Sequence, residues 1–206
     1  MCSKRNVGHV QLFCLSRFNA TFAQVIILTF IWMIASSGLA QARSIKLTRN
    51  FQPGSAVAFE RALTADIDTV ILNVSGGYLS EGMEIGRIIR ARKLRTVVPK
   101  SASCLSACAE AFLGGVGQKI EGIVAFHVPR SQRLGSRLQA FDAGLVGGTL
   151  TAIYRHDMGY GFGLTEAIMK WTNENRLLSF DSIVELNSYR SGSAVALLPS
   201  LIEYRP

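Results

Sequence analysis

The sequence predicts an α/β domain in which short strands of a parallel sheet alternate with helices, followed by a mainly helical C-terminal part. Strand-like and helix-like patterns alternate at short intervals between residues 44 and 128, which is typical of repeated βαβ units. The run 69–74 (TVILNV) is almost entirely apolar, as expected for a strand buried on both faces. Because 49% of the residues are hydrophobic and only 17% are charged, a disordered chain is excluded.

The elements of the first part follow from apolar periodicity and from glycine and proline positions. One helix, at 81–93, places Met83, Ile85, Ile88 and Ile89 largely on one side. Another helix, at 105–113, ends at Gly114 and Gly115, a common C-terminal signal. In chain order, the patterns predict a strand at 44–48, a helix at 56–63, a strand at 69–74, a helix at 81–93, a strand at 95–99, a helix at 105–113 and a strand at 120–128.

The C-terminal part is expected to contain three helices and one strand. Helical patterns run from 138 to about 156, from 165 to 172 and from 181 to 186, and the strand is expected at 194–198. No internal repeat or proline-rich linker divides this part from the preceding strands. We therefore expect residues 43–206 to form one domain.

The N-terminal segment 1–42 has the pattern of a secretory signal peptide. It is basic and has no acidic residue, it contains the apolar run 25–35, and it ends with the small residues Ala40 and Ala42. Cleavage is expected before Arg43, which would make the domain an exported, periplasmic protein. The alternative is an uncleaved membrane anchor, although the apolar stretch is shorter than the about 20 residues that a span needs.

Three short segments at the ends of predicted strands carry the candidate chemistry. They are 75–77 (SGG), 104–108 (CLSAC) and 126–129 (FHVP). Open α/β sheets bind ligands at the carboxyl ends of their strands. A serine at a helix N-terminus lies in a positive local potential, so Ser106 is a candidate nucleophile. One glycine N–H and the N–H of Ala107 would form an oxyanion hole, with His127 as general base. The simpler alternatives are a helix-capping serine and a structural histidine.

These segments together resemble the ClpP/crotonase superfamily, in particular its Clp protease proteolytic subunit branch. The resemblance covers about 69–129, with a weaker extension to residue 187, and includes 73–77 (NVSGG), 96–98 (TVV), Ser106–Ala107 and 126–129 (FHVP). It is greatest for exported bacterial ClpP-like proteins with a Cys-x-Ser-Ala-Cys motif. The resemblance implies a ClpP/crotonase-like fold, Ser106 as nucleophile, His127 as base, and oxyanion donors at Gly77 and Ala107.

The sequence departs from the family pattern at the third member of the catalytic triad. The family places an aspartate shortly before a segment that corresponds here to 177–179 (LLS), whereas this chain has Asn173 and Glu174 in that region. Either could orient His127, and so could Asp157 or Asp181. A Ser–His dyad without a third member and a site that has lost its activity are the remaining alternatives.

The cysteines Cys104 and Cys108 flank the candidate nucleophile, and no other cysteine lies in 43–206. In an oxidising compartment they are expected to form a disulfide, and the alternative is a pair of buried free thiols. No metal site and no cofactor are expected, because the chain has neither clustered ligands nor a phosphate-binding glycine motif.

The sequence thus favours an exported serine hydrolase, most simply a peptidase acting on a peptide or protein substrate. The first alternative is an exported binding or assembly protein that kept the fold and lost the chemistry, and the second is a crotonase-type acyl-CoA enzyme. The family resemblance implies a homo-oligomer. The net charge of +8 does not indicate a nucleic-acid partner if the domain is exported, and membrane contact is expected only through an uncleaved segment 1–42.

Overall fold

The computed structural model of the chain describes residues 43–129, 137–172 and 176–192. The segment 1–42, predicted as a signal peptide, and the strand predicted at 194–198 lie outside these ranges. None of the helices in the described ranges is long and apolar enough to cross a membrane.

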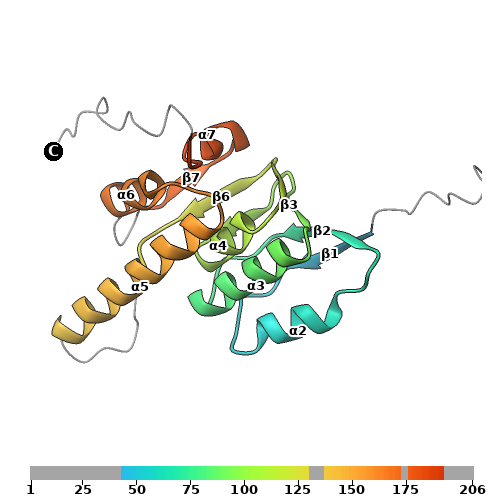
Figure 1. Cartoon of the computed structure of the whole chain (residues 1–206), viewed down its shortest axis with the longest axis horizontal. Coiled ribbons are helices and arrows are strands. Elements are labelled where there is room, and N and C mark those ends of the chain that lie inside the picture. The colour runs from blue at the N-terminus through green and yellow to red at the C-terminus, as the bar shows by residue number, and fades with distance from the viewer. Residues whose placement is uncertain (1–42, 130–136, 173–175, 193–206) are drawn as a thin grey trace, which may run out of the picture. The chain divides into compact units, whose positions relative to one another are not determined.

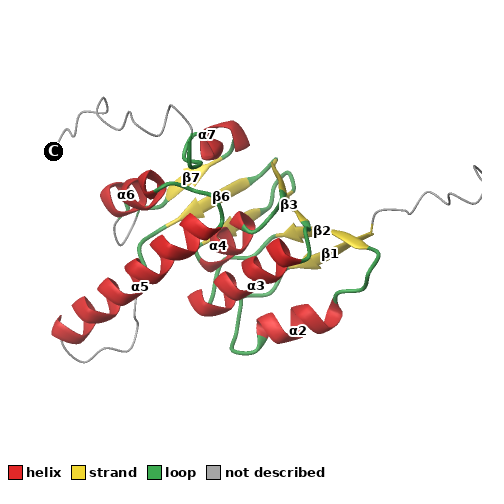
Figure 2. Ribbon diagram, in the orientation of Figure 1, coloured by secondary structure: helices red, strands yellow, loops and turns green. Residues whose placement is uncertain are grey.

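The described residues form two β-sheets flanked by helices (Figures 1 and 2). The first sheet is parallel, in the order β1 (Arg43–Leu47), β2 (Ile67–Leu72), β3 (Arg95–Val98) and β5 (Gly117–Ile120). The second contains β4 (Ser103–Leu105), β6 (Ile123–Phe126) and β7 (Leu178–Phe180), with β7 antiparallel to β6. The helices are α2 (Ser55–Ala62), α3 (Leu79–Ala91), α4 (Ala107–Leu113), α5 (Arg137–Asp157), α6 (Phe162–Trp171) and α7 (Ile183–Asn187).

The segment 103–126 differs most from the prediction. The helix predicted at 105–113 begins only at Ala107, because Ser103–Leu105 forms the strand β4. The single strand predicted at 120–128 is interrupted: Ile120 is the last residue of β5, whereas β6 lies in the other sheet. The chain changes sheet at Gly122, where a Cβ would lie 2.1 Å from the carbonyl oxygen of Ala102. Only a glycine fits this close approach, so the apolar run on either side concealed a break.

The two sheets are joined beyond the end of β2. Val74 forms a parallel bridge with Cys104 of β4. Its N–H donates to the carbonyl of Ser103 at 2.9 Å, and its own carbonyl accepts from the N–H of Leu105 at 3.0 Å. Because β4 is also parallel to β6, the carboxyl ends of three segments lie at one edge: the segment that follows β2, β4 and β6. That edge carries all three segments that the sequence singled out.

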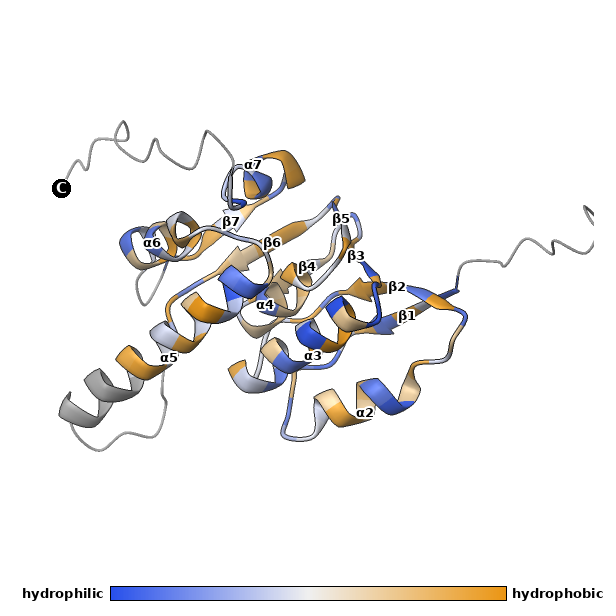
Figure 3. Cartoon of the chain, in the orientation of Figure 1, coloured by the Kyte–Doolittle hydropathy of each residue, from blue (hydrophilic) through white to orange (hydrophobic). Residues whose placement is uncertain are grey.

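Helix α4 forms the centre of the core, and every one of its residues is buried. It packs against α3, whose apolar side includes the buried residues Met83, Ile85, Ile88 and Ile89 (Figure 3). The two helices approach closely at a glycine of α3: a Cβ at Gly82 would lie 2.1 Å from the carbonyl oxygen of Ala107. The position of α4 therefore depends on a backbone contact made at its first residue.

Candidate active site

Ser106 occupies a sharp turn between β4 and α4. Its backbone has φ 58° and ψ −121°, a conformation that costs a non-glycine residue about 1–3 kcal/mol. The turn is held because the Ser106 N–H donates to the carbonyl of Ala125 at 2.8 Å, while the Ser106 carbonyl accepts from Ala109 at 2.9 Å. Ser106 stands at the N-cap position of α4, but its side chain makes no capping hydrogen bond to the helix. A strained strand-to-helix turn is how several hydrolases expose a nucleophilic serine.

His127 directly follows β6, which pairs with β4, the strand that leads to Ser106. Strands β4 and β6 are parallel, with Leu105 opposite Ala125, so Ser106 and His127 leave the same edge of the sheet. Neighbouring strands are about 4.8 Å apart. Among the described residues no hydrogen bond joins the Ser106 hydroxyl to the half-buried imidazole of His127. Such contacts are often loose in the absence of substrate, so the roles of Ser106 as nucleophile and His127 as base stay predictions.

The two glycines after β2, Gly76 and Gly77, lie against different residues. A Cβ at Gly76 would lie 3.0 Å from the Cβ of Ser106 and 3.4 Å from its hydroxyl oxygen. A Cβ at Gly77 would instead lie 2.2 Å from the carbonyl oxygen of Phe51. Both glycines have positive φ, 126° and 135°. Gly76 is therefore the glycine of the segment 75–77 that faces Ser106. The resemblance assigned the oxyanion donor to Gly77, and that assignment stays a prediction.

Ala107 is the first residue of α4, and it is fully buried. First-turn N–H groups have no partner within their helix, which is why the sequence predicts an oxyanion donor at this N–H. The N-terminal end of α4 adds a positive partial charge at the same place. The role of the Ala107 N–H as an oxyanion donor stays a prediction.

The third triad member is not identified among the described residues. Asn173 and Glu174 lie outside them. Asp181 follows β7, and the antiparallel pairing places it opposite Ile123, about 13 Å along the strand from His127. Asp157 is the last residue of α5, and Met158 follows it. The backbone carbonyls of Met158 and Leu113 both accept hydrogen bonds from the guanidinium of Arg90. Leu113 is the last residue of α4, so it lies about 10 Å along the helix axis from Ser106. Asp181 is therefore not suitably placed to orient His127, and Asp157 lies near the end of α4 that is farther from Ser106.

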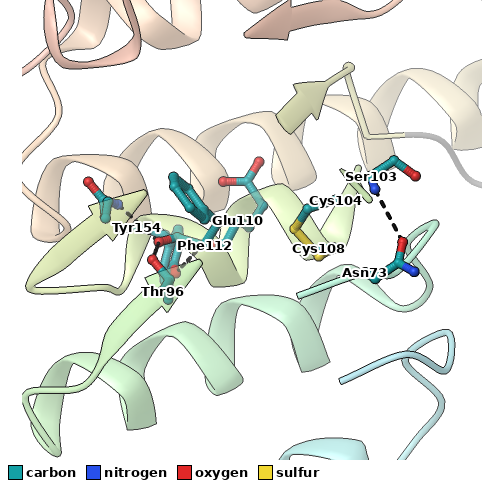
Figure 4. The surroundings of a disulfide bond; sticks show 9 residues. Asn73, Thr96, Ser103, Cys104, Cys108, Glu110, Phe112 and Tyr154 are labelled. Atoms are coloured by element: carbon teal, nitrogen blue, oxygen red, sulfur yellow. Dashed lines mark hydrogen bonds between the residues drawn. A yellow bond between two sulfur atoms is a disulfide. The ribbon is translucent and has the colours of Figure 1, made fainter. Parts of the chain in front are cut away.

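Cys104 and Cys108 are joined by a disulfide (Figure 4), and they lie two positions before and two positions after Ser106 in the chain. Both residues are fully buried, one in β4 and the other in the first turn of α4. The bond therefore links the strand before the Ser106 turn to the helix after it. Such a short loop is expected to stabilise the fold by about 2 kcal/mol, and it restrains the backbone on both sides of Ser106.

Alkylation of the denatured, non-reduced protein is expected to leave Cys104 and Cys108 unmodified, because both sulfur atoms are in the bond. Mass spectrometry of the peptides that contain them provides the measurement. The double substitution Cys104→Ala and Cys108→Ala should lower the free energy of unfolding by about 2 kcal/mol in urea. Alkylation of both thiols before reduction would contradict the disulfide.

A buried ion pair lies one helical turn beyond Ser106, and the sequence interpretation missed it. Arg155 of α5 makes a two-pronged contact with Glu110 of α4, and the two are 2% and 3% exposed. The third nitrogen of the guanidinium donates to Thr165 of α6 at 3.3 Å. The only signal in the sequence was a single glutamate within an otherwise apolar, alanine-rich helix.

A buried hydroxyl completes the packing around Glu110. Tyr154 donates to the backbone carbonyl of Glu110 at 2.7 Å. Burial, with a smaller contribution from the charge of Glu110, raises the pKa of Tyr154 well above its usual range, so the hydroxyl remains a neutral donor. Within the described residues, no group of three or more His, Cys, Asp or Glu side chains could hold a metal ion.

Comparison with known proteins identifies the fold. No family model matches the chain, and no curated protein matches it. Among solved structures, a ClpP1 mutant from Listeria monocytogenes has a TM-score of 0.54 and 16% sequence identity, and the match covers 76% of this chain and 92% of the other. A mutant of the 1510-N membrane-bound stomatin-specific protease has a TM-score of 0.48 and 17% identity, with 71% and 75% covered. The chain therefore has a ClpP-like α/β fold, which confirms the predicted fold class.

Proposed function

We propose that this protein is a serine hydrolase, and specifically a peptidase. Ser106 is the nucleophile, His127 is the general base, and the backbone N–H groups of Ala107 and of the glycine pair Gly76–Gly77 bind the oxyanion. The observation that carries the proposal is the strained backbone of Ser106 at the N-terminus of α4, beside Gly76. Strain of this kind is concentrated at functional sites.

The proposed reaction follows from these positions. The Ser106 hydroxyl oxygen attacks the scissile carbonyl carbon as its proton passes to His127, and the carbonyl oxygen becomes an anion held by the backbone donors. His127 then gives the proton to the leaving amine, so the peptide C–N bond breaks and an acyl-serine remains. Water, deprotonated by His127, releases the acid product and restores the serine. Each backbone donor of this kind accounts for about 10²–10³ in rate.

The setting of the enzyme is part of the same proposal. We propose an exported, periplasmic protein, supported by the signal-like pattern of 1–42 and by the disulfide. The substrate is a peptide or protein, and the active form is a homo-oligomer. Self-association is supported by apolar side chains of α5 that are more than half exposed: Leu145, Val146, Leu150 and Ile153.

A fluorophosphonate probe tests the proposal directly, because it reacts only with an activated serine. We expect the wild-type protein to be labelled at Ser106, Ser106→Ala to remain unlabelled, and His127→Ala to react at least about 10³-fold more slowly. Ser103→Ala, three residues earlier on β4, is the matched control and should react like wild type. Labelling of Ser106→Ala at the wild-type rate would contradict the proposal, and a folded wild type that never reacts would favour the alternative of a binding protein without activity.

A further inference from the structure

The imidazole of His127 has a partner that is not a carboxylate. Its Nδ1 atom lies 2.6 Å from the backbone carbonyl oxygen of Val128. A carbonyl oxygen can only accept a hydrogen bond, so this contact requires a proton on Nδ1. In the neutral ring the other nitrogen, Nε2, then carries a free lone pair. That is the tautomer in which a histidine can accept a proton from a serine hydroxyl.

The backbone of Val128, which carries this carbonyl, is restrained by neighbouring residues. The Val128 N–H donates to the hydroxyl oxygen of Thr172 at 3.2 Å, and that hydroxyl donates to the carbonyl of Ile168 at 2.6 Å. Thr172 is only 9% exposed, so this chain of hydrogen bonds is protected from water. Pro129, the next residue, restricts the backbone of Val128 to extended conformations. The backbone that carries the acceptor is therefore restrained, as an orienting group requires.

We propose that the Val128 backbone carbonyl takes the place of the triad carboxylate and positions His127 as the Nδ1–H tautomer. This inference rests on the proposed function, since it names the positioning group of the same site. It explains how a chain without an aspartate at the family position would still present a correctly oriented base. A neutral carbonyl stabilises the imidazolium less than a carboxylate does, so the rate should lie below that of a full triad.

Nitrogen-15 NMR of the imidazole rings in the resting protein tests the inference without any turnover. The chain has three histidines, so His127→Gln assigns the signals. We expect neutral His127 to be protonated on Nδ1, with Nε2 showing the signature of an unprotonated ring nitrogen. Protonation on Nε2, or an equal mixture of the two tautomers, would overturn the inference.

Two variants at Thr172 connect the tautomer to the hydrogen bonds around Val128. Thr172→Val removes the acceptor of the Val128 N–H and keeps the shape, so we expect a mixed tautomer and labelling of Ser106 that is at least about tenfold slower. Thr172→Ser keeps the hydroxyl and should restore both. Circular dichroism and thermal unfolding verify that each variant is folded. Wild-type tautomer and labelling rate in a folded Thr172→Val would count against the proposed role.

The competing acceptors are tested in the same experiment. Asn173→Ala combined with Glu174→Gln should leave the His127 tautomer unchanged, and a change would overturn the role of the carbonyl. The readouts also separate the two proposals. An Nδ1–H ring without probe labelling would refute the hydrolase and leave the orientation intact, whereas labelling with an Nε2–H ring would refute only the orientation.

Discussion

Replacing Glu110 with glutamine is expected to destabilise the protein by about 3–5 kcal/mol, because the guanidinium of Arg155 would remain buried without its counter-charge. The two side chains are 3% and 2% exposed, and both carboxylate oxygens of Glu110 accept from Arg155. Arg155→Met should have a similar effect by leaving the carboxylate unpaired. Urea unfolding followed by circular dichroism gives both values, and a loss below about 1 kcal/mol in either variant would contradict the prediction.

The double variant Glu110→Leu with Arg155→Met is the control for this pair. Buried ion pairs replaced as a unit by apolar side chains are often neutral or stabilising, because the cost of desolvating two charges disappears. We therefore expect the double variant to recover most of the stability that either single variant loses. A double variant as unstable as the sum of the two would show that the single losses come from packing and not from an unpaired charge.

The ion pair also connects the two elements of the candidate site. The N–H of Glu110 donates to the carbonyl of Ser106 at 3.3 Å, so the carboxylate side chain projects from the first turn after Ser106. The guanidinium carbon of Arg155 lies 5.7 Å from the ring centroid of Phe126, the residue before His127. One buried arginine therefore contacts both the helix that begins at Ser106 and the strand that ends before His127.

The position of the candidate site could be predicted from the sequence because it depends on local patterns. Strand-like runs followed by glycines, a serine and a histidine place Ser106 and His127 at strand ends, and the register of β4 and β6 agrees. The strands β4 and β7 could not be found, since three residues are too few to show a period.

The remaining features depend on distances between segments far apart in the chain. The contact between Glu110 and Arg155 joins residues 45 positions apart, and no local pattern encodes it. Gly76 and not Gly77 faces Ser106 because of the backbone angles of the two residues. A Gly–Gly sequence does not restrict these angles, so the sequence alone could not distinguish the two glycines. The acceptor at His127 is a backbone atom, which every residue possesses and which no residue type reveals.

Replacing Gly82 with alanine should damage both stability and activity, because the new methyl group would meet backbone and not a flexible side chain. Its Cβ would lie 2.1 Å from the carbonyl oxygen of Ala107 and 3.0 Å from the Ala107 Cα. Helix α3 must then separate from α4, at a cost of about 1–3 kcal/mol, or the first turn of α4 must move. Since the Ala107 N–H is the proposed oxyanion donor, a shift of about 1 Å is expected to slow probe labelling about a hundredfold.

The matched control is Gly148→Ala, another glycine-to-alanine change inside a helix. A Cβ at Gly148 of α5 meets nothing within 4 Å, so this substitution should stabilise the protein by about 0.5–1 kcal/mol through helix propensity and leave labelling unchanged. Urea unfolding is measured on both variants, and the two stability changes should have opposite signs if the close contact at Ala107 is decisive. The labelling rate is measured on both variants as well. Equal stability changes would mean that α3 and α4 accommodate the methyl group, and a normal labelling rate in a destabilised Gly82→Ala would mean that the separation of the helices leaves the oxyanion donor where it was.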